Sequence, residues 1–362
     1  MFLRHFGKRH ANLGLIVLSS CVALLLAEVS LRLFFPQPTG PVQFAWDSRF
    51  GVTAVPGQRA TRTLPGVYSF SHSNNSWGFR GPRDHTMKKT TVERWLFLGD
   101  SFTYGLGVND DAVFAEVVQR TLVENGRAVE VVNAGVCGTG TEYALNLFEQ
   151  WGASLKPAKV CLFFFANDFE DNSRHDYYEL DGGRLRKVFP KEKSLMLSKR
   201  WLRRFPIYGW LIAHSHLANL FKKTYLNRAA ASPRPVAGVI SYRIETVERP
   251  VRPALEYTQA LLSALEDRVS AAGAELVLFL VAGPADVSAY RESGSGRWPE
   301  LFLAEWAQQA HVRFVSLAPS LAATGYPNEE LFITGDNHWT ERAHRIAAEA
   351  ILATLEERVP SR

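Results

Sequence analysis

The chain has 362 residues, of which 46% are hydrophobic and 12% aromatic, and its formal net charge is +5. This composition can bury a large core, which excludes a disordered or fibrous protein and suits one large domain with an appendage or two modest domains. Three cysteines, Cys21, Cys137 and Cys161, are too few for a disulfide framework and lack the Cys and His spacing of a zinc site. We expect Cys137 and Cys161 as two buried free thiols, with a single bridge between them as the alternative. We expect no metal and no organic cofactor.

The first 35 residues predict a membrane anchor. Residues 1–10 (MFLRHFGKRH) form a short basic tail, and residues 11–35 (ANLGLIVLSSCVALLLAEVSLRLFF) are mostly apolar. At about 1.5 Å per residue, such a helix can cross a bilayer core of about 30 Å. The basic flank predicts a cytoplasmic N-terminus, with everything after Pro36 on the other side of the membrane. Glu28 and Arg32 are four residues apart and can pair at the outer interface.

Two alternatives to an uncleaved anchor remain open at this stage. A cleaved signal peptide usually has a shorter apolar core and a small-residue cleavage site, whereas this apolar run continues to Phe35. The segment LSSC, which ends at Cys21, resembles a bacterial lipoprotein processing box, but an apolar stretch follows it instead of a polar tether.

Residues 36–92 are rich in Pro, Gly, Ser and Thr and predict a membrane-proximal linker with a few short strands. The segment NNSWGFRGPRD (residues 74–84) lies within it. We interpret this segment as an edge hairpin or turn that covers the core, with a substrate-facing loop as the alternative.

From residue 93 to residue 357, short apolar runs alternate with amphipathic segments. We expect strands at 93–99, 128–135, 158–166, 274–283 and 312–319, and helices at 111–126, 141–155, 253–273, 298–310 and 340–357. Strands that are apolar on both faces and alternate with helices predict a parallel sheet covered on both sides. The expected fold is an α/β three-layer α/β/α sandwich with a doubly wound, flavodoxin-like sheet, in which ligands bind beyond the carboxyl ends of the strands.

Residues 169–250 interrupt this alternation. Residues 184–228 contain twelve Lys or Arg against one acidic residue, so that this segment carries +11 and the rest of the chain −6. Aromatic residues lie between these charges, as in KRWLRRFPIYGW. We expect a helical lid whose aromatic face packs on the core, or a surface that docks on an anionic bilayer or an acidic polysaccharide. Nucleic acid is disfavoured as a partner because the anchor places this segment outside the cytoplasm.

Residues of the types that catalyse serine-dependent hydrolysis follow the predicted strands. Ser101, in GDSFTYG, comes directly after the first strand, where a tight turn can expose its hydroxyl. Asp336 and His338, in GDNHWT, lie two apart just before the last helix, so that the carboxylate can orient an imidazole that takes the serine proton. Gly135 and Asn167 follow the second and third strands and can supply a backbone N–H and an amide NH₂ to an oxyanion.

These blocks, in the order Ser, Gly, Asn, His, resemble the SGNH (GDSL-type) hydrolase superfamily. The resemblance covers residues 94–355 without the basic insert, on GDSFTYG, NAGVCGTGT, FFANDFEDN and DNHWTERAHRIAAEAI. It implies a Ser-His-Asp triad of Ser101, His338 and Asp336, with an oxyanion hole formed by Ser101, Gly135 and Asn167.

The chain departs from the family pattern at two places. Phe165 stands where the third block usually has Gly, which predicts a narrowed or reshaped pocket beside Asn167. The acid lies two residues before the His, whereas three is more common, and this Asp-x-His-Trp pattern is similar to that of membrane-associated bacterial proteins that handle acetyl groups on exopolysaccharides and cell-wall polymers.

The resemblance implies a membrane-anchored serine esterase or acyltransferase of the bacterial inner membrane, with its catalytic domain in the periplasm. Its expected substrate is O-acyl carbohydrate, with O-acetyl as the expected group, or a small ester, and a membrane-bound acyltransferase is a possible partner. The sequence leaves open whether water or a sugar hydroxyl accepts the acyl group. The alternative is a non-catalytic anchored module that binds polysaccharide or organises an acylation complex.

Overall fold

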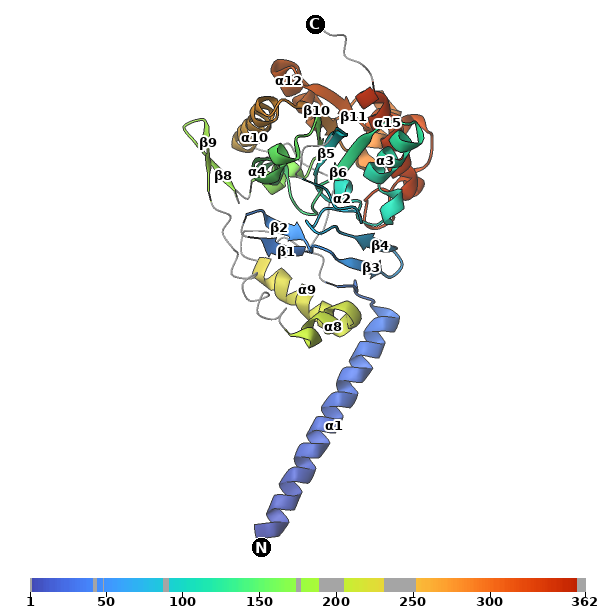
Figure 1. Cartoon of the computed structure of the whole chain (residues 1–362). Coiled ribbons are helices and arrows are strands. Elements are labelled where there is room, and N and C mark those ends of the chain that lie inside the picture. The colour runs from blue at the N-terminus through green and yellow to red at the C-terminus, as the bar shows by residue number, and fades with distance from the viewer. Residues whose placement is uncertain are drawn as a thin grey trace.

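A five-stranded sheet forms the centre of the computed structural model (Figure 1), in the order β11-β10-β7-β5-β6 with every neighbouring pair parallel. Its strands are β5 (Glu93–Gly99), β6 (Val129–Asn133), β7 (Lys159–Phe164), β10 (Glu275–Leu280) and β11 (Arg313–Ser316). The structure describes residues 2–41, 44–47, 49–86, 91–173, 177–188, 205–230 and 252–356. The strand order confirms the predicted doubly wound, flavodoxin-like sheet.

Both faces of this sheet are buried, because successive side chains of a strand point to opposite sides. In β5, Trp95 and Phe97 belong to one apolar cluster, while Leu96 and Leu98 belong to the other. The first cluster is closed by α3 (Phe114–Glu124), α11 (Pro284–Ser293), α13 (Ala318–Ala323) and α15 (Glu341–Glu356), and the second by α4 (Thr141–Leu147), α10 (Arg252–Ala271) and α12 (Trp298–Ala310). The three layers are therefore those that the alternating pattern predicted.

Helix α11 is an element that the sequence analysis missed. Its sequence, PADVSAYRES, contains few large apolar residues, and only Val287 among them is fully buried. Its Pro284 lies in the first turn, and Gly294 ends it in the left-handed conformation. The helix signals were present in its caps, whereas the apolar periodicity was too weak to indicate it.

Residues 44–73 form two antiparallel strand pairs that lie against the carboxyl end of the sheet. The strands are β1 (Phe44–Asp47), β2 (Gly51–Ala54), β3 (Arg59–Leu64) and β4 (Tyr68–Ser73). The pairs lie between the sheet and helix α1 (Phe2–Phe34) in Figure 1. Phe70 belongs to a small apolar cluster with Tyr104, which follows β5, so these short strands are packed on the α/β core.

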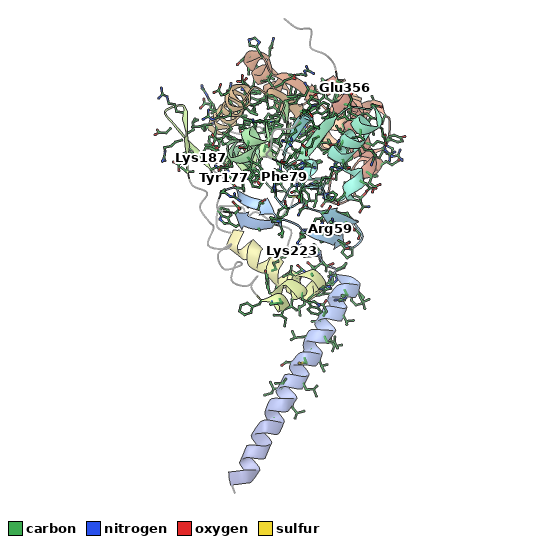
Figure 2. The ribbon with its side chains drawn as sticks, viewed as in Figure 1. Arg59, Phe79, Tyr177, Lys187, Lys223 and Glu356 are labelled. Atoms are coloured by element: carbon green, nitrogen blue, oxygen red, sulfur yellow. The ribbon has the colours of Figure 1, made fainter. Side chains whose placement is uncertain are left out.

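The loop after β4 also enters the core. Phe79 is buried near the centre of the globular part (Figure 2) and packs edge-on against Trp151, with ring centroids 5.3 Å apart. The Asn75 side-chain oxygen accepts hydrogen bonds from the backbone N–H groups of Trp77 and Phe79. The segment of residues 74–84 is thus a side-chain-stabilised turn that places Phe79 in the core.

Helix α1 is long and apolar enough to cross a membrane over Gly14–Phe34, by length and composition, and none of that window is buried in the protein. A membrane anchor and a signal sequence both fit this finding. The Glu28–Arg32 pair predicted from the spacing is present, with Arg32 Nε 2.8 Å from Glu28 Oε1.

Part of the basic insert is described. It contains the hairpin β8 (Tyr178–Asp181) and β9 (Arg184–Lys187), then α8 (Pro206–His214) and α9 (His216–Ala230). Helices α8 and α9 lie beside the end of α1 and next to β1 and β3 (Figure 1). Residues 189–204, which carry six of the twelve basic residues of the segment 184–228, and residues 231–251 lie outside the described residues. The thiols of Cys137 and Cys161 are buried and free.

His344 of α15 gives the fold a predictable response to acid. Burial lowers the pKa of His344 to about 3, and its Nδ1 accepts a hydrogen bond from Phe114 N–H. Because the unfolded chain takes up this proton near pH 6.5 and the folded chain does not, stability is full above that pH and falls as pH drops towards 3. The amide oxygen of Gln can also accept the hydrogen bond from Phe114 N–H, but Gln does not titrate. We therefore expect that the midpoint urea concentration of unfolding decreases less between pH 7 and pH 4.5 in His344→Gln than in the wild type. The exposed His311→Asn should leave that pH dependence unchanged, and an equal effect of both variants would contradict the prediction.

Candidate active site

Ser101 begins α2 (Ser101–Tyr104), directly after β5, and is completely buried. A Cβ on Gly99 would lie 2.3 Å from Thr103 Oγ1 and 2.8 Å from the Phe163 carbonyl oxygen, so only glycine allows this turn. The side chain of Asp100 caps α2 by accepting a hydrogen bond of 2.9 Å from Phe102 N–H. The turn therefore holds Ser101 at the carboxyl end of strand β5, which lies between β7 and β6.

His338 and Asp336 lie in the loop before α15, as the sequence predicted. His338 Nε2 is 2.8 Å from Ser101 Oγ, and His338 Nδ1 is hydrogen-bonded to Asp336 Oδ1. The imidazole is buried, and its ring lies 4.8 Å from the ring of Phe102. One chain of hydrogen bonds thus connects the three predicted residues, although Ser101 and His338 are 237 positions apart in the sequence.

The Asp336 carboxylate is held in its charged form. Burial alone would raise its pKa, but the hydrogen bond to His338 and the charges of His338 and Arg62 keep the pKa of Asp336 below its usual range. Arg62 comes from β3, so the N-terminal strands contribute to the electrostatics of this site. A charged Asp336 can orient the imidazole and stabilise its protonated form.

Gly135 lies beside the Ser101 turn. A Cβ at this position would lie 2.5 Å from the backbone nitrogen of Tyr104, so the close approach requires glycine. In this structure the Gly135 N–H donates to the Asn133 side-chain oxygen at 3.1 Å, while the Asn133 amide donates to the Thr103 carbonyl at 2.7 Å. Asn133, which the sequence analysis did not single out, thus fixes the loop after β6 to the turn that carries Ser101.

Asn167 directly precedes the short helix α6 (Asp168–Asn172) after β7, makes no side-chain capping hydrogen bond to it, and is partly exposed. Its Nδ2 donates to Asp171 Oδ2 at 3.3 Å, whereas its Oδ1 has no hydrogen-bond partner among the described residues. An amide nitrogen carries two hydrogens, so one donor remains for another acceptor.

Phe165, at the position of the family's usual Gly, has its ring in the core. The ring packs against Phe102 with centroids 4.5 Å apart, in the cluster that includes Trp339. It therefore supports α2 from the core side, and the narrowing of a pocket beside Asn167 stays a prediction.

Two buried carboxyl groups next to the site were not singled out from the sequence. Burial raises the pKa of Asp100 to about 7, and burial together with the charges of Asp100 and Asp171 raises that of Asp168 well above its usual range. Negative charge beside a developing oxyanion would oppose its formation. Because burial raises the pKa of Asp100 to about 7, part of this carboxyl group is protonated at neutral pH, and that part does not add to the repulsion.

Arg80 connects the segment of residues 74–84 to the Ser101 turn. Its side chain is only 2% exposed and donates to the carbonyl oxygens of Gly105 and Val108, which follow α2, and to the carboxylate of Asp110. Its guanidinium also lies over the Tyr104 ring, 4.8 Å from the centroid. The burial of Arg80 is not predictable from the sequence, because nothing local indicates that an Arg in a Gly-rich turn is buried.

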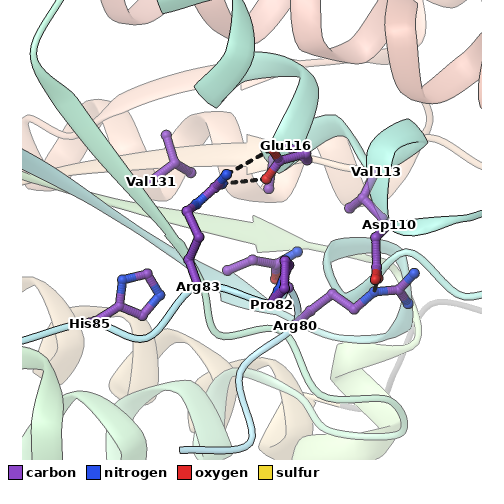
Figure 3. Close-up of a pocket in the computed structure, with 11 residues that line it drawn as sticks. Arg80, Pro82, Arg83, His85, Asp110, Val113, Glu116 and Val131 are labelled. Carbon is purple, nitrogen blue, oxygen red and sulfur yellow. Dashed lines mark hydrogen bonds and ion pairs between the residues drawn. The ribbon is translucent and has the colours of Figure 1, made fainter. Parts of the chain in front are cut away.

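A small pocket lies beside this contact (Figure 3). Arg80 points towards Asp110 and Arg83 towards Glu116, and each of these two arginines of the pocket lining forms an ion pair with that carboxylate. Neither Ser101 nor His338 lines this pocket. Among the described residues, no group of His, Cys, Asp and Glu side chains could hold a metal ion.

A doubly wound parallel sheet with a hydrogen-bonded Ser, His and Asp at its carboxyl end is typical of a class of α/β/α-sandwich hydrolases. Residues 97–346, more than half of the chain, match the GDSL-like lipase/acylhydrolase family. The chain belongs to this family, which confirms the SGNH resemblance, and its enzymatic class is that of a carboxylic ester hydrolase.

Solved structures of similar architecture are distant in sequence. TesA is 17% identical, with a TM-score of 0.42, and the match covers 73% of this chain and 98% of TesA. The psychrotrophic esterase EstA from Pseudoalteromonas sp. is 14% identical, with a TM-score of 0.39 and coverage of 73% and 97%. Axe2 from Geobacillus Stearmophilus, an acetyl-xylooligosaccharide esterase, is 15% identical, with a TM-score of 0.41 and coverage of 75% and 97%. No curated protein matches the chain.

The hydrogen-bonded Ser, His and Asp predict a graded loss of esterase activity. Ser101→Ala and His338→Ala should each lower kcat by roughly 10⁶-fold, and Asp336→Asn by roughly 10⁴-fold, because Asp336 only orients the base. Hydrolysis of a p-nitrophenyl ester, with thermal unfolding as the folding control, measures this order. Turnover near that of the wild type in folded Ser101→Ala would contradict the assignment.

Arg80 and Arg83 form a matched pair for testing the buried contact. Arg80→Met removes the donor of two carbonyl oxygens and the cationic partner of Asp110, which still accepts from Ser73, so we expect the free energy of unfolding to fall by about 3 kcal/mol. The Arg83 side chain is 50% exposed, and Arg83→Met should lower it by less than about 1 kcal/mol. Urea unfolding of both variants measures the difference, and equal losses would show that the Arg80 contact carries no special stability.

Proposed function

We propose that this chain is a serine esterase or O-acyltransferase that acts on O-acyl carbohydrate, with O-acetyl as the acyl group. The observation that carries the proposal is the hydrogen-bond chain from Ser101 through His338 to Asp336. Membership of the GDSL-like lipase/acylhydrolase family supports ester chemistry at this serine.

The first half of the reaction forms an acyl-enzyme. Ser101 Oγ attacks the acyl carbon while His338 Nε2 takes the hydroxyl proton, and Asp336 stabilises the resulting imidazolium. The tetrahedral intermediate then expels the sugar oxygen, which takes the proton from His338, and the acyl group remains as an ester on Ser101.

The oxyanion of that intermediate needs donors that are already in place. We assign this role to the backbone N–H groups of Ser101 and Gly135 and to the Asn167 amide. The Asn167 amide supports the assignment, because one of its two hydrogens remains after the contact with Asp171. The Gly135 N–H donates to Asn133 in this structure and must exchange that acceptor for the oxyanion.

The second half of the reaction decides between the two activities. Water activated by His338 releases the free acid, whereas a sugar hydroxyl activated in the same way yields a new ester. The residues required are identical, so the acceptor that reaches the acyl-enzyme selects the outcome. A membrane-bound acyltransferase would be a fitting source of acyl groups in the transfer case.

We further propose that α1 is an uncleaved anchor in a bacterial inner membrane, with the N-terminus in the cytoplasm and the catalytic domain in the periplasm. The apolar window Gly14–Phe34 supports the span, and the basic residues before it support the orientation.

The test uses the full-length chain in detergent or nanodiscs. A fluorophosphonate probe should label the wild type and leave Ser101→Ala unlabelled. Incubation with p-nitrophenyl acetate and oligosaccharide acceptors, followed by mass spectrometry, then shows either free acetate or an acceptor heavier by one acetyl group. A folded wild type that binds polysaccharide but resists the probe would overturn the enzymatic proposal in favour of an anchored binding module.

A further inference from the structure

Helix α8 carries an exposed apolar stripe. Ile207, Trp210 and Leu211 are 68%, 59% and 37% exposed, at spacings of three and four that place them on one face, while Ile212 is buried on the opposite side. No Lys, Arg, Asp or Glu occurs between Pro206 and His214. Of the eight large apolar side chains that are exposed after residue 35 in the described chain, five lie on α8, on α9 or just before α8.

This stripe is fixed relative to α1 by polar contacts. The Glu28 carboxylate of α1 accepts hydrogen bonds from the Ser215 hydroxyl and from the backbone N–H groups of His216 and Leu217, which begin α9. Arg32 donates to the His214 carbonyl at 2.7 Å. A carboxylate at a helix N-terminus satisfies orphan N–H groups and interacts favourably with the helix dipole. The turn between α8 and α9 is therefore tied to one particular turn of α1.

The position of the α8–α9 turn along α1 determines how close this turn lies to the bilayer when α1 spans it. Residues 11–27 contain no charged side chain and span about 25 Å as a helix, close to the thickness of a bilayer core. Glu28 and Arg32 then lie at the outer interface, and α8 lies beside them at the same end of the globular part (Figure 1).

We propose that α8 lies in the outer interface of the bilayer, with Ile207, Trp210 and Leu211 inserted among the lipid headgroups and the first acyl carbons. The proposal rests on the proposed anchoring of α1. It adds a second membrane contact that prevents the catalytic domain from swinging about the anchor. We define α8 and the first turn of α9 as the interfacial foot.

The neighbourhood of the foot favours lipid over a protein partner. Leu33, Phe34 and Phe35, at the end of α1, are each 70% exposed, so exposed apolar side chains occur both at the end of the spanning helix and on the foot beside it. Trp is enriched at bilayer interfaces, where its ring is partly wet. Lys223, on α9 next to the foot (Figure 2), supplies positive charge that suits anionic headgroups.

The foot is also connected to the site. Gly40 N–H donates to the Ala213 carbonyl of α8, and Thr39 forms a β-bridge with Thr63 of β3, the strand that carries Arg62. A foot held in the interface would therefore set the distance of the Ser101 site from the bilayer surface.

Spin labels at matched positions test the proposal in the full-length chain. In a Cys21→Ser background, a nitroxide is attached to Ile207→Cys or Leu301→Cys, and the protein is placed in nanodiscs of phosphatidylethanolamine and phosphatidylglycerol at 3:1. Leu301 is 66% exposed on α12, far from α1, and is the aqueous control. We expect the label at 207 to collide mainly with oxygen and the label at 301 mainly with a water-soluble nickel chelate. The ratio of oxygen collisions to chelate collisions should be at least about fivefold higher at 207 than at 301.

A third label, at Leu25→Cys in α1, separates the two proposals. Oxygen access at 25 with water access at 207 equal to that at 301 would overturn the foot and leave the anchor. Water access at 25 would overturn both. Exclusion of both reagents from 207 would overturn the lipid proposal, because it would show that protein covers the stripe. Fluorophosphonate labelling of Ser101 reports that each variant is folded.

Discussion

The close approach of α2 to the ends of the neighbouring strands is the constraint on which the site depends. Gly99 and Gly135 leave no room for a Cβ, since such an atom would lie 2.3 Å and 2.5 Å, respectively, from its nearest neighbour. That approach places Ser101 at the carboxyl end of a parallel sheet, where the loop before α15 brings His338 within 2.8 Å. A displacement of α2 would change this hydrogen bond. The glycines that allow the close packing of α2 therefore also fix the position of Ser101 relative to His338.

The N-terminal strands take part in that packing. Arg80 pairs with Asp110 and holds the carbonyl oxygens that follow α2, while the Tyr104 hydroxyl donates to Asn74. Arg62 of β3 adds positive charge near Asp336. Residues 36–92, expected as a linker with a few short strands, therefore do more than connect the helix to the domain. They contact the turn that carries Ser101, place positive charge near Asp336 and cover the site.

The sheet and the site residues were predictable because their signals are local. Runs such as RWLFL and KVCLFF are apolar on both faces, and parallel topology brings the residues after them to one edge. Asn133, Arg80 and the raised pKa of Asp168 were not predictable, because each depends on partners far away in sequence. Helix α11 was missed because its caps, and not its periodicity, define it.

The geometry also bears on how substrate reaches Ser101. The serine is completely buried, and the layer of β1 to β4 lies between the sheet's carboxyl end and α1 (Figure 1). An ester substrate must therefore pass the residues that cover the serine, and this layer lies on the side of the molecule from which the apolar helix extends. If α1 spans the membrane, an acyl donor or polymer at the bilayer surface lies on the same side of the domain as the layer of β1 to β4. The same arrangement would favour transfer over hydrolysis whenever the acceptor is itself held at that surface, because a concentrated hydroxyl competes better with water for the acyl-enzyme.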